Sequence, residues 1–173
     1  HIPHGETIMV KVINQKVTDS YALYHADCVH VAQGLPKNSV GLSVYSPPFP
    51  GMYVYSNSAY DMGNVQIIDE MIGQYEFLQR EMLRITMPGR NNLMHITQGV
   101  AQKGRDGYIG MKDFRGKIID MMTNVGWDYY GEFTIDKNPQ LKAMRTKDHG
   151  LMFGTLVSDA ARLHMAMPDI VLQ

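Results

Sequence analysis

The sequence predicts an α/β fold with a mainly parallel sheet covered by helices on both faces. Short β-rich segments alternate with longer segments of helical periodicity along the 173 residues. Hydrophobic residues make up 45% and charged residues 19% of the chain, which is ordinary usage for a globular domain. A chain of this length suits one domain around a single core. We assign residues 1–20 to an N-terminal arm or edge strand and residues 21–173 to that domain.

The expected elements follow from apolar periodicity and from turn residues. Helices are expected over 28–35, 67–86 and 112–124, with Met87-Pro88-Gly89 ending the second and Gly126 closing the third. The glycine-rich, charged residues 98–110 are expected to form a surface loop. Strands are expected over 21–25, 39–45, 91–97, 127–135, 151–157 and 169–173.

Several features favour the cytoplasm. The chain contains no run of about eighteen apolar residues, and its first residues lack the basic-then-apolar order of a secretory signal. The single cysteine, Cys28, cannot form an intrachain disulfide, and the 14 methionines would be oxidation targets outside a reducing compartment. We therefore expect a cytoplasmic protein without a membrane partner.

The overall charge gives no general attraction to nucleic acid. The formal net charge is -1 and the pI is about 6.7. Local basic residues could still contact phosphates, although a solvated surface explains each of them equally well. The candidates are Arg80, Arg84, Arg90, Lys103, Arg105, Lys137, Lys142, Arg145 and Lys147.

The segment Ser46-Pro47-Pro48-Phe49 is the strongest chemical signal. It directly follows the expected strand 39–45. Ligands of α/β folds usually bind at such C-terminal strand ends. Two successive prolines fix the backbone φ near -65° and remove two amide donors, so the loop is stiff. One small hydroxyl and one aromatic ring on a rigid loop suit a planar ligand with an amino group at its edge.

These residues carry a resemblance to DNA methylases. A strand followed by Asp/Asn/Ser-Pro-Pro-aromatic is the hallmark of enzymes that methylate the exocyclic amine of adenine (N6) or cytosine (N4). The chain resembles the class β enzymes of this kind, most of all those of phages and prophages, over roughly residues 21–173. The matching segments are Leu23 to Cys28, Leu35-Pro36, Asn38-Ser39-Val40, Arg84-Ile85-Thr86, Pro88-Gly89-Arg90, His95, Asp113 to Gly116, Gly126-Trp127, Asp136 to Pro139, Arg145-Thr146-Lys147 and Met167-Pro168-Asp169.

The resemblance implies a Rossmann-like, S-adenosylmethionine-dependent methyltransferase in a bacterial or phage-infected cell. Ser46 and the Pro47 carbonyl would accept hydrogen bonds from the target amine, in the loop that Pro48 stiffens, and Phe49 would stack on the flipped base. Hydrogen bonds that bend the amine toward tetrahedral geometry would restore its nucleophilicity. No covalent cysteine intermediate is required, so Cys28 has no expected role.

Further positions take expected roles from the same resemblance. Asp27 would lie near the adenosine part of the cofactor, and it is also an adequate helix N-cap by itself. Residues 51–63 are expected to form a mobile aromatic loop, with surface packing as the plain alternative. The expected DNA contacts are Tyr53, Tyr55, Arg145 and Lys147, with Tyr60 as a further candidate. His95 is interpreted as a satisfied core histidine.

The family's second cofactor element, an Asp-Pro-Phe-x-Gly-x-Gly turn, does not occur in this sequence. Gly104, Gly107 and Gly110 follow no clear strand and do not replace it. The fold is therefore expected to be incomplete, with a cofactor pocket that lacks one wall. A truncated chain, one half of a split enzyme, or a non-catalytic domain that binds DNA or a partner would each explain this. A homodimer or a complementing subunit is then the expected protein partner beside DNA.

Other chemistries are weaker. His25, Asp27, Cys28 and His30 are possible metal ligands, but their spacing matches no standard zinc motif. A serine hydrolase is disfavoured because no Gly-x-Ser-x-Gly segment is present and Ser46 precedes prolines. Serine at the first loop position leans toward N4-cytosine, and adenine stays open, as does the recognition sequence.

Overall fold

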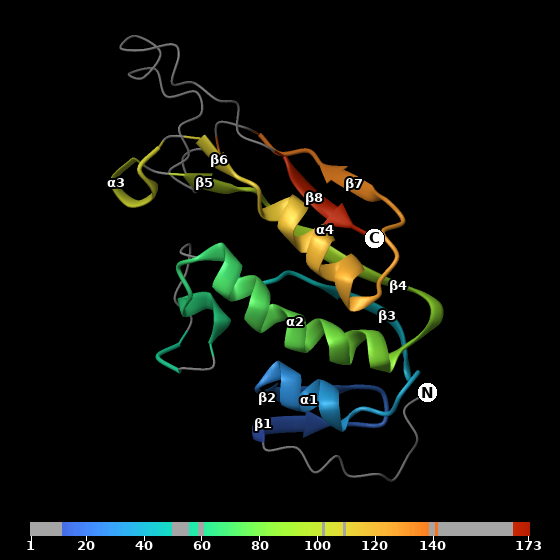
Figure 1. Cartoon of the computed structure of the whole chain (residues 1–173). Coiled ribbons are helices and arrows are strands. Elements are labelled where there is room, and N and C mark those ends of the chain that lie inside the picture. Colours follow the sequence, from blue (N-terminus) through green and yellow to red (C-terminus); the bar gives the residue numbers. More distant parts are fainter. Residues whose placement is uncertain are drawn as a thin grey trace.

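A computed structural model describes residues 12–49, 56–58, 61–101, 103–108, 110–138, 141 and 168–173. Its helices and strands alternate as the sequence predicts (Figure 1). Among the described residues, none of the helices has the length and apolar character that a membrane span requires. The elements are β1 (Val12–Val17), β2 (Ala22–Ala26), α1 (Cys28–Gly34), β3 (Val40–Tyr45), a 3-10 turn η1 (Met62–Asn64), α2 (Ile68–Ile85), β4 (Thr86–Ile96), β5 (Gly99–Ala101), α3 (Lys103–Asp106), β6 (Gly110–Lys112), α4 (Phe114–Val125), β7 (Glu132–Ile135) and β8 (Asp169–Leu172).

The main sheet has four strands in the order β3-β4-β8-β7. Strands β3 and β4 are parallel, with Val44 opposite Leu93 and Tyr45 opposite Met94. Strand β8 runs antiparallel to both of its neighbours. The β-rich segments predicted the strands, but the expectation of a mainly parallel sheet is wrong for this part of the chain. Only β3 and β4 are joined by the helical crossover, α2, that parallel pairing requires.

Two hairpins flank this sheet. Strands β1 and β2 pair antiparallel, and so do β5 and β6. The second hairpin and α3 replace the surface loop expected over 98–110. Each of these elements is only three or four residues long, so their apolar pattern is too short to reveal them.

Helices α2 and α4 lie side by side in front of the sheet, and α1 packs against α2 on its far side (Figure 1). Side chains alternate along each strand, so one face of the sheet meets these helices. Met94, Ile96, Ile170 and Leu172 point to this face and are buried. They form one core with helix residues that include Met71, Tyr75, Leu78, Phe114 and Ile118.

The opposite face of the sheet is not covered by helices of the described residues. Its apolar side chains remain accessible: Leu42 is 56% exposed, Val44 69% and Phe133 59%. The expected second helical layer is thus not seen in this part of the chain.

The remaining element predictions differ from the structure mainly at their ends. The helices lie within two residues of the expected bounds. Strand β4 begins earlier than expected because Thr86 pairs with Val40. The register then shifts at an irregularity, and regular pairing resumes where Leu42 lies opposite Asn91. The strand expected over 127–135 is shortened to Glu132–Ile135. The strand expected over 151–157 lies outside the described residues, and 169–173 forms β8 as predicted.

Both ends of α4 are capped, and Gly126 closes the helix as the sequence predicts. The Asp113 carboxylate accepts a hydrogen bond from the Gly116 amide at 2.8 Å, which satisfies a free donor of the first turn. Gly126 ends the helix in the left-handed conformation, with φ of +115°. A β-carbon at this position would also lie 3.3 Å from Cδ2 of Leu83 in α2.

Replacement of Gly126 therefore tests the end of α4. Gly126→Ala should lower the free energy of unfolding by about 1–2 kcal/mol, because alanine is strained at this φ. Gly73→Ala is the matched control, since Gly73 is exposed within α2 with open space around its Cα. It should raise stability by roughly 0.5–1 kcal/mol. Urea denaturation followed by circular dichroism measures both, and equal effects would contradict this account of the cap.

Candidate active site

The loop Ser46-Pro47-Pro48-Phe49 leaves the C-terminal end of β3 as predicted. Pro47 is buried, Pro48 and Phe49 are half-buried, and Ser46 is exposed. The rings of Phe49 and Phe114 meet edge to face with centroids 6.1 Å apart. This contact ties the loop to the start of α4. The exposed hydroxyl is thus held on a backbone that is anchored on both sides.

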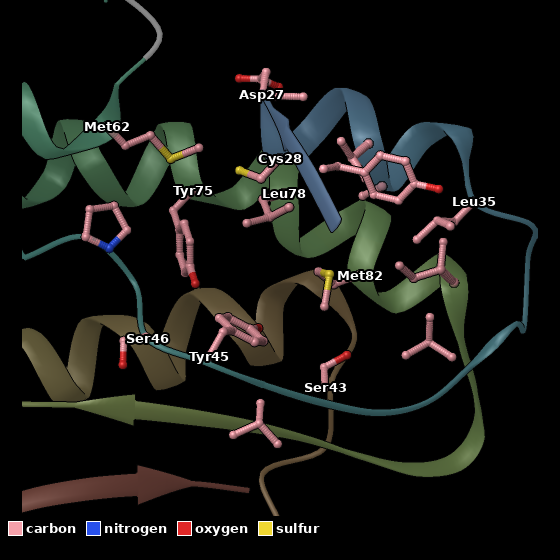
Figure 2. Close-up of a pocket in the computed structure, with 18 of the residues that line it drawn as sticks. Asp27, Cys28, Leu35, Ser43, Tyr45, Ser46, Met62, Tyr75, Leu78 and Met82 are labelled. Atoms are coloured by element: carbon pink, nitrogen blue, oxygen red, sulfur yellow. The ribbon is translucent and has the colours of Figure 1, made fainter. Parts of the chain in front are cut away.

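A cavity of about 700 Å³ lies beside this loop (Figure 2). Its lining combines Ser43 and Tyr45, from the helix-covered face of β3, with Val44 and Ser46 from the opposite face. Since both faces contribute, the cavity runs along the outer edge of β3. This strand is the end of the four-stranded sheet as described. The facing wall comes from β2 and α1.

Tyrosines form the wall of the cavity next to α2. The Tyr45 hydroxyl donates to Oε1 of Gln79 at 2.9 Å. Burial raises the pKa of Tyr45 and raises that of Tyr75 well above its ordinary value. Both phenols therefore stay neutral at physiological pH. This wall offers hydroxyl groups and aromatic surface, and it offers no charge.

Asp27 brings a carboxylate to the opposite wall of the cavity, which Asp61 also lines. It follows β2 directly and caps α1, because its carboxylate accepts from the His30 amide at 3.0 Å. The cap uses Oδ1, so Oδ2 can face a ligand. Partial loss of hydration, and then the charge of Asp27, raise the pKa of the Cys28 thiol. That thiol stays protonated at neutral pH and is a poor nucleophile.

No group of three or more possible metal ligands occurs among the described residues. The possible ligands His25, Asp27, Cys28 and His30 do not gather into such a group. The Asp27 carboxylate has one histidine beside it, His30, whose Nδ1 lies 3.7 Å away. Two ligands are fewer than the three or four protein groups that a zinc site needs.

The structure places a histidine beside Ser46 that sequence reasoning did not assign to the site. Nδ1 of His95 lies 3.0 Å from Oγ of Ser46, and its Nε2 lies 2.8 Å from Oδ2 of Asp169. The three residues belong to the β3 loop, β4 and β8 respectively. They are far apart in the chain, so no local spacing indicates the contact. His95 is satisfied as interpreted, since both ring nitrogens have partners, but its side chain is 34% exposed and therefore lies at the margin of the core.

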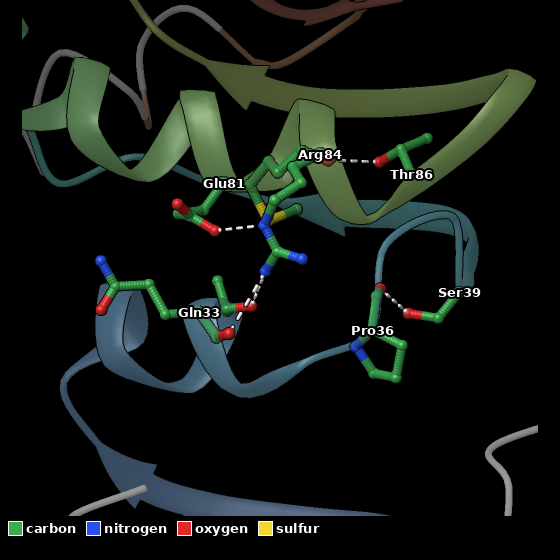
Figure 3. Close-up of polar contacts among 8 residues, drawn as sticks. Gln33, Pro36, Ser39, Glu81, Arg84 and Thr86 are labelled. Carbon is green, nitrogen blue, oxygen red and sulfur yellow. Dashed lines mark hydrogen bonds and ion pairs between the residues drawn. The ribbon is translucent and has the colours of Figure 1, made fainter.

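Arg84 holds the cavity wall in place instead of facing a phosphate. Its guanidinium donates to the carbonyls of Ala32 and Gln33, at 2.9 Å and 3.3 Å, and pairs with Glu81 in α2 (Figure 3). These carbonyls lie in the last turn of α1, where backbone acceptors lack helical partners. Arg84 therefore fastens α1, which carries the Asp27 wall, to α2.

Other predicted contacts divide into paired and undescribed residues. Arg80 forms an ion pair with Glu76, and Lys137 forms one with Asp169. The expected DNA contacts Tyr53, Tyr55, Arg145 and Lys147 lie outside the described residues. So do most of the loop 51–63 and the further candidates Tyr60 and Lys142.

The chain has the fold of DNA modification methylases. TTHA0409 of Thermus thermophilus, named a putative DNA modification methylase, aligns in its complex with S-adenosyl-L-methionine with a TM-score of 0.60 and 16% identity. PvuII DNA methyltransferase, named as cytosine-N4-specific, aligns with a TM-score of 0.56 and 14% identity. At these identities the likeness establishes the fold. No protein-family profile and no curated protein matches the sequence.

The chain spans about half the length of these solved structures. The alignment to TTHA0409 covers 84% of this chain and 49% of that one. The alignment to PvuII methyltransferase covers 85% and 46%. The α/β methyltransferase fold predicted from the sequence is confirmed, and it is present in part.

The role of Arg84 gives a test of how the cavity wall is held. Arg84→Met keeps the length of the side chain but removes the guanidinium that donates to the α1 carbonyls of Ala32 and Gln33. It should lower the free energy of unfolding by about 1–2 kcal/mol. Arg80→Met, which removes only an exposed pair within α2, should change it by less than roughly 0.5 kcal/mol. Chemical denaturation distinguishes the two, and a harmless Arg84→Met would refute the fastening role.

Proposed function

We propose that this chain carries the catalytic half of an S-adenosylmethionine-dependent DNA amino-methyltransferase. The observation that carries the proposal is the position of Ser46. Its exposed hydroxyl lies at the C-terminal end of β3, at a cavity that Asp27 also lines, in a chain with the methylase fold. In open α/β sheets, ligands bind at the C-terminal ends of the strands.

The loop positions a substrate amine. The Ser46 hydroxyl and the Pro47 carbonyl accept hydrogen bonds from the two amine hydrogens. An exocyclic amine is a weak nucleophile because its lone pair is delocalised into the ring, and these two bonds favour a geometry in which the lone pair is localised. The buried Pro47 and the Phe49–Phe114 contact keep both acceptors in place before the substrate arrives. Preorganised acceptors cost no rearrangement during the reaction.

The cavity fits the proposed cofactor. Its volume of about 700 Å³ suits a ligand of nucleoside size. Asp27 would hold hydroxyl or ammonium groups, and the apolar wall that includes Leu35, Leu78 and Met82 would hold the adenine ring. When bound, this cofactor supplies an activated methyl group on a sulfonium. The side chains of the cavity bind and orient it.

Phe49 is the proposed stacking partner of the base. Its ring is half-buried, so part of its surface is open to a ligand. The target base must leave the duplex, which costs a few kcal/mol, and stacking on the ring offsets part of that cost. Tyr53, Tyr55, Arg145 and Lys147 remain the proposed contacts to DNA.

Cytosine N4 is the acceptor we place ahead of adenine N6. Serine stands at the first position of the loop, which leans toward cytosine in the family that the sequence resembles. A similar fold, PvuII methyltransferase, is named as cytosine-N4-specific. Methylation of oligonucleotides that contain one of the two bases distinguishes the acceptors.

A second candidate is a domain that acts only with a complementing chain or segment, or one that binds DNA or a partner without catalysis. Among the described residues, no strand pairs with the outer edge of β3, and Leu42, Val44 and Phe133 are accessible on the face without helices. Both features favour this candidate. An unpaired strand edge beside an apolar face is a typical surface for further pairing. A second copy of the chain would be the simplest complement.

Cofactor binding separates these candidates. Calorimetric titration of the 173-residue chain with S-adenosylmethionine should give a dissociation constant on the order of micromolar, a common strength for a small-molecule site. Asp27→Asn should weaken binding by about tenfold, as expected for loss of one charged hydrogen bond. Asparagine still caps α1, so this variant changes the charge and preserves the helix. No heat of binding from a folded protein would favour the second candidate.

Turnover tests the loop itself. Ser46→Ala and Phe49→Ala should each lower the rate of methyl transfer to DNA by about 10² to 10³, the size of effect that loss of one preorganised group produces. Cofactor affinity should change little. Incorporation of a radiolabelled methyl group measures the rate. Wild-type rates in either variant would show that the loop does not hold the base.

A further inference from the structure

The hydrogen bonds that connect Ser46, His95 and Asp169 form a continuous path. Ser46 Oγ lies 3.0 Å from Nδ1 of His95, and the other ring nitrogen lies 2.8 Å from the Asp169 carboxylate. His95 pairs with Val171 across β4 and β8, so Asp169, two residues away, points to the same face. This is the face of the sheet that no helix among the described residues covers.

We propose that these three residues are a proton relay that orients the Ser46 hydroxyl and takes up the proton released when the amine is methylated. The inference rests on the proposed methyl transfer and deepens it. His95 contacts Ser46 and need not touch the substrate, so it is a positioning residue. Asp169 in turn positions His95.

The arrangement selects one tautomer of His95. The Asp169 side chain is 3% exposed and also forms an ion pair with Lys137, which favours its charged form. A carboxylate only accepts hydrogen bonds, so Nε2 of His95 must carry a proton. In the neutral ring Nδ1 is then the acceptor, and the Ser46 hydroxyl donates to it. The lone pairs of Ser46 Oγ are thereby directed away from His95 and toward a substrate amine.

The same path accepts the proton that the methylated amine must lose. The amine nitrogen forms a bond to the methyl carbon as the carbon–sulfur bond breaks, and the electron pair of that bond stays on sulfur. The nitrogen is left with a positive charge and gives one proton to Ser46 Oγ, while the Ser46 proton moves to Nδ1 of His95. The resulting imidazolium is stabilised by Asp169. Its ring is 34% exposed, so the proton can return to solvent.

The surroundings of Ser46 favour proton transfer over nucleophilic attack. Serine hydrolases use the same order of serine, histidine and carboxylate, but they need backbone amides that bind an oxyanion. The two residues after Ser46 are Pro47 and Pro48, which have no amide hydrogen. Ser46 is therefore placed to accept a proton and lacks adjacent donors for an acyl intermediate.

The tautomer of His95 is the first test, and it does not depend on methylation activity. Long-range ¹H–¹⁵N correlation spectra of the histidine-labelled 173-residue chain, at a pH where the ring is neutral, should show the proton on Nε2. His95→Gln assigns the signal. Asp169→Asn should shift the ring toward the other tautomer, because an amide can donate to Nε2. The control Asp69→Asn, an exposed carboxylate paired with Lys117, should leave the signal in place.

A proton on Nδ1 in the wild-type chain would overturn the relay, because Ser46 would then be the acceptor of that bond. If Asp169→Asn does not fold, the wild-type tautomer decides the question. Among the described residues, Asp169 of β8 pairs with His95, and Lys137 from the segment after β7 pairs with Asp169 in turn. Lys137→Met should preserve the Nε2 proton, since it leaves the acceptor of that bond intact.

Methyl transfer gives the second test. His95→Gln should lower kcat by about 10² to 10⁴, the usual range for loss of a proton acceptor, and should leave cofactor affinity unchanged. The dependence of the rate on pH should also differ between His95→Gln and the wild type. Equal rates and equal pH profiles would overturn the proposal. An Nε2 proton in a chain that methylates no DNA would instead count against the proposed function while the hydrogen-bond path stands.

Discussion

The register between β3 and β4 decides where the candidate site lies. The strands are parallel, so they end at the same edge of the sheet, and Tyr45 stands opposite Met94. The next residues, Ser46 and His95, then point to the same face and meet. A shift of one residue in either strand would send one of them to the helix-covered side. The contacts of the site are therefore a consequence of how α2 returns the chain to the sheet.

Helix α2 fixes that register from the covered face. It contacts α1 and α4 on its two sides, and its buried residues Met71, Tyr75 and Leu78 share a core with β4 and β8. Its C-terminal end is also fastened: the backbone amides of Asn38 and Ser39 donate to the carbonyls of Arg84 and Ile85. The two faces of the sheet thus carry different kinds of side chain. One face holds the core, and the other carries the polar groups of the site.

This division explains how a chain that spans about half the length of the similar solved structures presents a formed loop. The Ser46 loop depends on β3, β4 and α4, all of which the structure describes. The cavity also depends on the outer edge of β3, which no described strand pairs with, and on the facing wall from the β2–α1 segment. An edge strand that lines a cavity of this size has backbone groups available for a ligand or for another strand.

The sequence by itself determined the helices, most strands and the position of the loop. Helices α2 and α4 have long apolar periodicity and clear end signals, and the strand before Ser46 ends at two prolines, so local chemistry is sufficient. Short elements escaped this reasoning, since three-residue strands such as β5 and β6 have too few positions to show a period.

Only the tertiary structure decided which side chains meet. Ser46, His95 and Asp169 lie on three segments, and their contact depends on strand order and register. Those are set by the packing of the whole core and leave no mark in the local sequence. The partners of Arg84 also depend on packing. Its charge suggests a phosphate contact, but its guanidinium donates to carbonyls of α1. Local patterns specify elements, whereas the partners of a polar side chain are fixed by how those elements pack.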